Sequence, residues 1–160
     1  MQDQSTEILA TAQASVPRRW MGIGMLALLG GLLVYVAFVT PPATTGWQVF
    51  LLLLGAASLY LAEKMRRATE RVVQLTSGGL QDDTGVIIAG IEEIAAVSRG
   101  TFAVKPSNGF TIRLNGGGAR AWQPGVYWRF GKRVGIGGVL PGAQTKFMAE
   151  MLEAMLAQRS

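Results

Sequence analysis

Residues 20–62 read WMGIGMLALLGGLLVYVAFVTPPATTGWQVFLLLLGAASLYLA and contain no charged side chain. A transmembrane helix needs about 20 apolar residues to cross about 30 Å of hydrocarbon, so this stretch is about twice as long as one span requires. Pro41-Pro42 divides it, because proline lacks the amide N–H and clashes with the preceding helical turn. The stretch therefore predicts a hairpin with spans at about residues 20–40 and 45–64, in a membrane region covering residues 18–67.

Basic residues flank this hairpin, and the loop between its two spans has none. Arg18 and Arg19 precede the first span, and a basic cluster from Lys64 to Arg71 follows the second. Because positive residues stay on the cytoplasmic side of a membrane, we expect both termini to be cytoplasmic. The first apolar run is too long for the core of a signal peptide, and no small-residue cleavage site follows it. We therefore expect an uncleaved, multi-pass membrane protein.

Small residues recur along both spans. Ala27 and Gly31 are four residues apart in the first span, and the second span carries Gly55, Ser58 and Ala62. Small side chains at this spacing let helix backbones approach closely. We expect these five residues to mediate helix packing, either between the two spans or between the hairpin and another membrane protein.

The composition narrows the chemistry that the chain can perform. It has no Cys and no His, which excludes disulfides, thiolate nucleophiles, His-based triads and haem His ligands. The adjacent pairs Asp82-Asp83 and Glu92-Glu93 point apart on a strand, so neither forms an acid–base couple, and they indicate a turn and a solvent-exposed edge. We expect no enzyme activity, no catalytic residue, no metal and no cofactor.

The membrane region is flanked by a short polar segment and by a longer one. Residues 1–17 predict a cytoplasmic N-terminal tail, in which Thr6–Val16 forms either a weak helix along the membrane surface or a disordered tail. Residues 68–160 are enough for one small domain. Short apolar runs separated by turn residues predict strands at residues 72–76, 86–89, 101–105, 110–114, 119–122, 126–130 and 134–139.

Three further patterns complete this domain. Asp82–Gly85 predicts a tight hairpin turn. Ile91–Val97 fits either a helical turn or a strand. Apolar residues on one helical face predict an amphipathic helix over 143–158. The fold class is therefore α+β, with a two-helix transmembrane hairpin followed by a small, bent β-sheet or barrel and a C-terminal amphipathic helix.

A family resemblance accompanies this order of elements. The stretches LTSGGLQD (residues 75–82) and GVIIAGIEEI (residues 85–94) resemble the strand–turn–strand run of bacterial membrane proteins that carry a pleckstrin-homology-like (bPH) domain. The resemblance implies a PH-like domain over residues 68–160 and a location in the bacterial inner membrane. It implies no catalytic residues.

Charge is distributed unevenly within the predicted domain. Residues 94–149 contain eight basic and no acidic residues, with aromatic residues between them. A basic surface beside an anionic leaflet gains about 1 kcal/mol for each basic group held near it. The same pattern also fits a solvated face over core aromatics, or contact with an acidic protein. The candidate residues for contact with anionic lipid or a partner are Arg113, Arg120, Trp122, Trp128, Arg129, Lys132 and Arg133.

These patterns lead to a functional hypothesis with one alternative. We expect a non-enzymatic, membrane-anchored interaction or assembly module, an accessory subunit whose basic and aromatic domain contacts a membrane protein complex or anionic lipid headgroups. The alternative is a membrane-tethered sensor that binds a small anionic ligand in the PH-like domain. We expect membrane lipids and another integral membrane protein as partners, and no nucleic acid.

Overall fold

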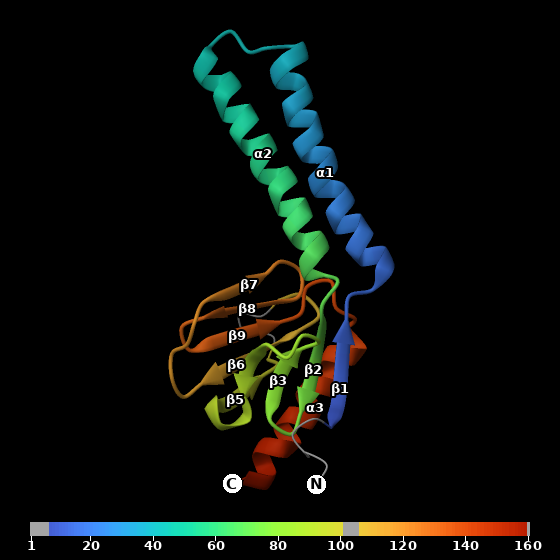
Figure 1. Ribbon diagram of the computed structural model, residues 1–160, viewed down its shortest axis with the longest axis vertical. Coiled ribbons are helices and arrows are strands. Elements are labelled where there is room, and N and C mark those ends of the chain that lie inside the picture. The colour runs from blue at the N-terminus through green and yellow to red at the C-terminus, as the bar shows by residue number, and fades with distance from the viewer. Residues whose placement is uncertain (1–6, 101–105, 160) are drawn as a thin grey trace. The chain divides into compact units, whose positions relative to one another are not determined.

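The computed structural model describes residues 7–100 and 106–159 and divides the chain into two compact units. The helical unit is Val16–Arg67, and the sheet unit combines Met1–Ser15 with Ala68–Ser160. Figure 1 shows the elements, which follow the chain in the order β1 (Ile8–Gln13), α1 (Val16–Val39), α2 (Thr45–Ala68), β2 (Val72–Thr76), β3 (Gly79–Asp82), β4 (Ile87–Gly90), a 3-10 turn (Ile91–Glu93), β5 (Ile94–Ser98), β6 (Phe110–Leu114), β7 (Ala121–Gln123), β8 (Tyr127–Phe130), β9 (Arg133–Ile136) and α3 (Gly142–Arg159).

The helical unit consists of α1 and α2, which both have 24 residues and are apolar enough to cross a membrane. At 1.5 Å per residue each helix is about 36 Å long, slightly more than the hydrocarbon thickness. Only 17% of each apolar window is buried in the structure, unlike the core helix of a soluble protein. The predicted division is confirmed, since α1 ends before Pro41-Pro42 and α2 begins at Thr45.

Two glycines, Gly30 and Gly55, lie at a close contact between α1 and α2. A Cβ atom on Gly30 would lie 2.7 Å from Leu59 Cγ and 2.9 Å from the Gly55 carbonyl oxygen, so only glycine fits at this crossing. The buried residues of α1 are Ile23, Gly30 and Ala37. They recur every seven residues, which is the period of two α-helices that pack with a left-handed supercoil.

Of the five small residues predicted to pack helices, three are buried in the structure and two are exposed. Gly55, Ser58 and Ala62 are buried within the helical unit. Ala27 and Gly31 are exposed, and no atom lies within 4 Å of a Cβ built on Gly31. Their four-residue spacing is real, but it falls on the side of α1 that faces away from α2. Packing within the hairpin therefore uses Gly30, the direct neighbour of the predicted Gly31.

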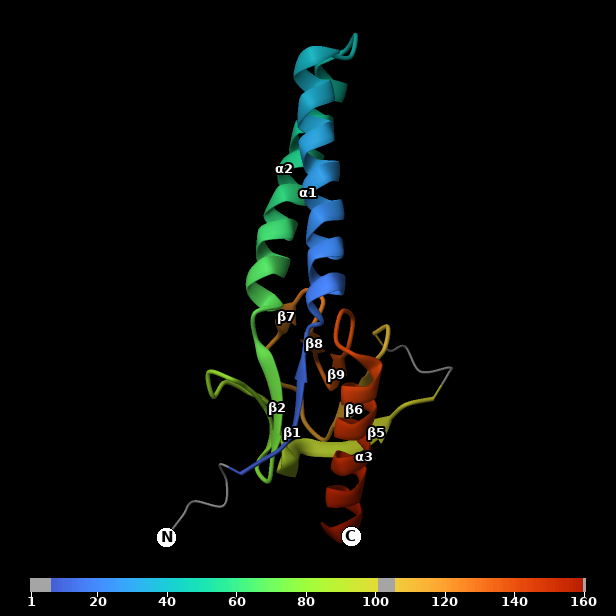
Figure 2. The ribbon, with the colours of Figure 1, turned by 90° about the vertical axis from the view of Figure 1, so that its right-hand side faces the viewer.

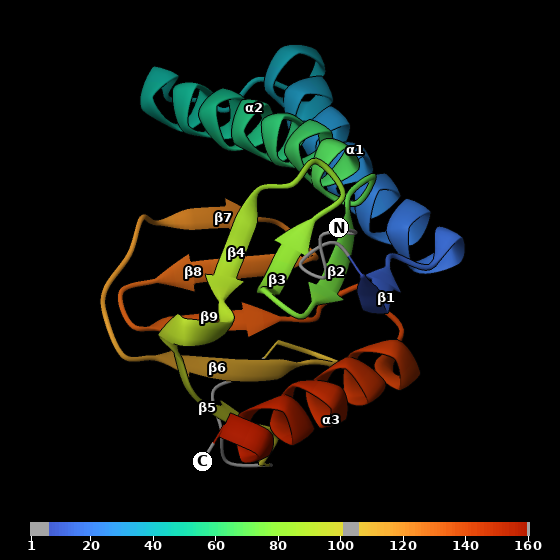
Figure 3. The same ribbon diagram turned by 60° about the horizontal axis from the view of Figure 1, so that its bottom comes forward.

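In the sheet unit, the described strands form two antiparallel sheets. The first has the order β1-β2-β3-β4 and the second has the order β5-β6-β9-β8-β7. Figure 3 shows that the strands of the two sheets cross, and α3 lies along one open side in contact with β1, β5 and β6. The predicted α+β class with a C-terminal helix is confirmed. Both described sheets are open; the sequence predicted either a bent sheet or a barrel, and a closed PH-like barrel is not confirmed.

The N-terminal segment belongs to the first sheet. β1 pairs with β2, and Gln13 lies opposite Val72 although the whole helical unit separates them in sequence. Ala10, Ala12 and Ala14 are buried, while the residues between them are exposed. Figure 2 shows β1 between β2 and α3, the two elements that it contacts most. The expectation of a surface helix or disordered tail is therefore wrong over β1, and the hairpin is an insertion between two paired strands.

Other strand predictions agree with the structure to different degrees. β2 and β6 have the predicted bounds, and the turn at Asp82–Gly85 is present, with Gly85 at φ 83°. The stretch Ile91–Val97 combines both alternatives, since a 3-10 turn leads directly into β5. β3 was not predicted. Its Gly79 has φ 122°, and a Cβ there would lie 2.3 Å from the Ala89 carbonyl oxygen. The strand predicted at residues 101–105 lies outside the described residues.

The helix contact gives a matched pair of substitutions. We expect Gly30→Ala to destabilise the hairpin by about 1–3 kcal/mol, because the new methyl group overlaps Leu59 and the Gly55 backbone. Gly31→Ala should leave stability unchanged or raise it by up to about 1 kcal/mol, because the site is open and alanine favours helix. Thermal unfolding in mild detergent, followed by circular dichroism, measures both. Equal effects would contradict the Gly30–Gly55 contact.

The role of β1 can be tested in the same way. Ala12 is fully buried, whereas its neighbour Thr11 is exposed. We expect Ala12→Asp to lower the free energy of unfolding by about 3 kcal/mol or more, because a carboxylate enters the core without a partner. Thr11→Asp should change it by less than about 0.5 kcal/mol. Urea unfolding monitored by tryptophan fluorescence gives both values. If the two variants were equally stable, β1 would not be part of the fold.

Candidate functional site

Strand alternation places part of the predicted contact set on one side of the second sheet. Side chains on a strand point alternately to opposite faces. In β6, Phe110, Ile112 and Leu114 are buried, while Arg113 is exposed. The register carries this alternation across the sheet, so the outer face presents one connected set of side chains. We call it the aromatic-basic face, and it consists of Arg113, Trp122, Trp128, Phe130 and Arg133.

Three aromatic rings form the centre of this face. Trp122 lies directly opposite Trp128, and the rings of Trp128 and Phe130 stack with their centroids 5.8 Å apart. The Trp128 ring lies over β9, where a Cβ on Gly135 would come within 2.3 Å of it. Trp122 and Phe130 are 45% and 49% exposed, so nearly half of each side chain is available to a partner.

Two arginines lie at the edge of the aromatic rings. Arg113 is directly opposite Arg133 across β6 and β9, and Arg133 is also opposite Phe130. Cβ atoms at such paired positions are about 5 Å apart, and like charges there repel each other. An anion bound between the two guanidinium groups would relieve that repulsion.

The basic side chains of the sheet unit divide into those that form ion pairs and those that do not. Acidic side chains pair with Arg71, Arg99, Arg129, Lys146 and Arg159. Within the part of the sheet unit that the structure describes, the basic side chains that form no ion pair are Arg113, Arg120, Lys132 and Arg133. Arg120 precedes β7 and Lys132 lies in the turn between β8 and β9, and both are exposed.

Arg129 does not belong to the contact surface. It alternates with Trp128 and Phe130 and therefore points to the inner side of the sheet, where its side chain is only 13% exposed. Its guanidinium donates a 2.8 Å hydrogen bond to the Ile88 carbonyl and lies 3.5 Å from Glu93 Oε2. The prediction that Arg129 contacts lipid or a partner is therefore wrong, because this side chain connects the two sheets.

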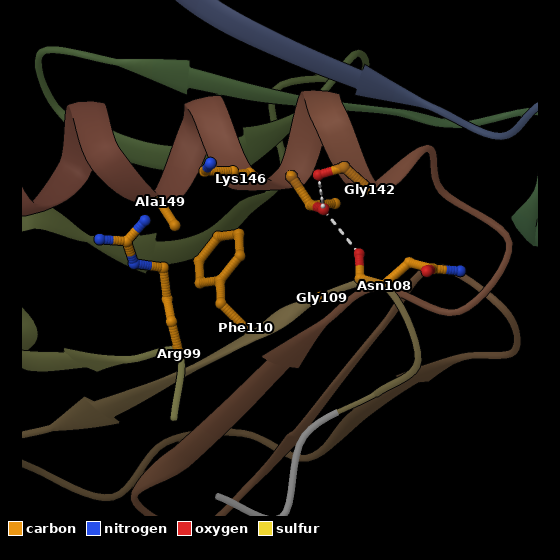
Figure 4. A pocket seen from close by; sticks show the side chains of 8 residues that line it. Arg99, Asn108, Gly109, Phe110, Gly142, Lys146 and Ala149 are labelled. Carbon is orange, nitrogen blue, oxygen red and sulfur yellow. Dashed lines mark hydrogen bonds between the residues drawn. The ribbon is translucent and has the colours of Figure 1, made fainter. Parts of the chain in front are cut away.

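A cavity of about 310 Å³ lies between β6 and α3, lined in part by Arg99, Asn108, Phe110 and Lys146 (Figure 4). Its two basic side chains are already compensated. Arg99 contacts Glu150 at 3.1 Å and Glu153 at 2.8 Å, and Lys146 Nζ is 4.0 Å from Glu150. Loss of solvation lowers the pKa of Arg99, but the hydrogen bonds to the two glutamates outweigh it and the net shift is upward. This charge balance disfavours an anionic ligand.

The acidic residues of the first sheet have structural contacts. Asp82 Oδ1 accepts hydrogen bonds from the Thr84 amide, the Thr84 hydroxyl and the Val86 amide, which fixes the turn.

Burial raises the pKa of Tyr127, and the charge of Asp82 raises this pKa further, against a smaller opposite effect of Arg71. No group of three potential Asp or Glu metal ligands occurs among residues 7–100 and 106–159.

Comparisons with known proteins add no family assignment. A scan of protein-family models, a search of curated proteins and a search of solved structures each find no match to this chain.

The different roles of Arg129 and Arg133 can be separated by stability. We expect Arg129→Gln to lower the free energy of unfolding by about 2 kcal/mol, because the Ile88 carbonyl and Glu93 lose their partner. Arg133→Gln should leave stability unchanged or raise it slightly, because it removes the repulsion with Arg113. Thermal unfolding of both variants measures this. A larger loss for Arg133→Gln would contradict the assignment of the two faces.

Proposed function

We propose that this protein is a non-enzymatic, membrane-anchored interaction module that acts through its aromatic-basic face. The observation that carries this proposal is the grouping of Trp122, Trp128 and Phe130 on one sheet surface with two arginines that form no ion pair among the described residues. Large aromatic side chains and arginine are the residues that dominate binding surfaces. Trp122 and Phe130 remain 45% and 49% exposed on a sheet unit whose core is already filled by other side chains.

The helical unit supports the membrane anchor. The strands before and after the hairpin, β1 and β2, pair with each other, and Gln13 lies opposite Val72. The chain therefore leaves and re-enters the same sheet at neighbouring positions, and a hairpin that crosses the membrane twice satisfies this. Cleavage of α1 as a signal sequence would also remove β1 from the core. With the basic flanks of the hairpin, these points favour an inner-membrane protein whose two termini are both cytoplasmic.

The sheet unit is consistent with a PH-like domain. Two crossing antiparallel sheets with a C-terminal helix along an open side are the elements that the family resemblance implies. The anionic-ligand sensor is the weaker alternative, because the acidic residues of α3 already neutralise both basic groups of the cavity.

Two phenylalanines allow a controlled test of the binding face. Phe130 on the aromatic-basic face and Phe147 on α3 are 49% and 52% exposed. A photo-crosslinking phenylalanine analogue at Phe130, in the full chain in its native membrane, should form adducts with a lipid or a protein. The same analogue at Phe147 should form several-fold fewer adducts, as measured by mass spectrometry.

The adducts at Phe130 should also depend on charge. We expect Arg113→Gln with Arg133→Gln to reduce them several-fold, whereas Arg71→Gln with Lys146→Gln removes the same charge elsewhere and should not. Equal labelling at Phe130 and Phe147, or labelling that ignores the arginines, would refute the proposed function.

A further inference from the structure

We propose that the aromatic-basic face docks on anionic lipid headgroups of the membrane that holds the hairpin. This inference rests on the proposed function and names the partner of the same face. The chemistry of the face is that of a membrane interface, where rings enter the boundary of the acyl chains and basic groups contact phosphate.

The aromatic rings fit the apolar part of such a surface. Trp122, Trp128 and Phe130 lie together on one side of β7 and β8, so they can enter a bilayer interface as one group. Tryptophan prefers this depth because its ring is amphipathic, with a polar N–H and a large apolar body. The hollow beside Trp122 and Trp128 has a volume of only about 60 Å³, whereas pockets that hold small ligands usually measure about 300–1,000 Å³.

The charges fit the anionic part. Arg113 and Arg133 lie opposite each other beside Phe130, and Lys132 extends from the adjacent turn. Residues 94–149 contain no acidic side chain, so nothing within the second sheet repels a phosphate group. A lipid phosphate between the two guanidinium groups replaces their mutual repulsion with two charge-assisted contacts.

The covalent connections favour a lipid surface over a soluble acidic partner. β1 ends at Gln13 and α1 begins at Val16, while α2 ends at Ala68 and β2 begins at Val72. At no more than about 3.6 Å per residue, the connections can extend about 11 Å and about 14 Å. With both ends held this close to the hairpin, the sheet unit meets lipid headgroups at a high local concentration. A second copy of the chain is disfavoured, because its face would carry the same positive charge.

Tryptophan fluorescence in the full chain can test this docking. The chain has four tryptophans, and replacing Trp20 and Trp47 by Phe leaves Trp122 and Trp128 as reporters. The protein is placed in nanodiscs of phosphatidylcholine, with or without phosphatidylglycerol, that contain lipids brominated along the acyl chain. We expect strong quenching in discs with phosphatidylglycerol and at least twofold weaker quenching in phosphatidylcholine alone.

Matched variants identify the charges responsible. Arg113→Gln with Arg133→Gln should lower the ratio of docked to undocked protein about thirtyfold, since each basic group near an anionic surface contributes about 1 kcal/mol. Arg71→Gln with Lys146→Gln should leave the ratio unchanged. Lys132→Gln, which lies in a turn, gives a smaller loss and serves as a second variant if the double variant unfolds. Quenching that is absent, or independent of both lipid charge and the arginines, overturns the proposal.

This result can be separated from a failure of the proposed function. If Phe130 forms arginine-dependent adducts with a protein while the tryptophans are not quenched, the face binds a protein and the lipid assignment is wrong. If Phe130 forms no adducts and the tryptophans are not quenched, both proposals fail.

Discussion

Pairing between β1 and β2 is the constraint on which the rest of the molecule depends. It joins two segments separated by the whole helical unit, and it brings Gln13 opposite Val72. It also completes the core, because β1 supplies the small buried residues over which α3 packs. The same pair closes the base of the hairpin, so its two helices begin and end at neighbouring points of one sheet. The two chain ends of the hairpin are therefore tied together by a single strand pair.

A second constraint is the register of the second sheet. Because side chains alternate, a slip of one residue in β8 would exchange its inner and outer residues. Trp128 and Phe130 would then enter the core, and Arg129 would lose its contacts with Ile88 and Glu93. Gly135 supports the observed register, since only glycine leaves room for the Trp128 ring on β9. One strand register thus decides both which side chains pack in the core and which form the exposed aromatic-basic face.

Sequence patterns predicted the elements whose signal is local. The two helices, β2, β6 and α3 each carry their own apolar period or breaker residues, and the structure contains them. β1 was missed because its buried face consists of alanines, which favour helix when isolated and form a strand here only through contacts with β2 and α3. Within the hairpin the contact uses Gly30, while the predicted Gly31 faces away from α2. A four-residue spacing shows that two small residues share a face, but not which neighbour that face meets.

The candidate site was predicted as a set of residues but not as a surface. Seven residues were chosen because they lie in an acid-free stretch, yet charge along a sequence ignores the alternation that sends Arg129 inward and Arg133 outward. Phe130 was left out of the set although it follows Trp128 by two residues and so shares its face. Which basic side chains stay unpaired depends on glutamates from distant parts of the chain. Glu93 compensates Arg129, and glutamates on α3 compensate Arg99. Once these pairs form, the basic side chains that have no ion pair among the described residues of the sheet unit include Arg113 and Arg133, which lie beside the exposed rings.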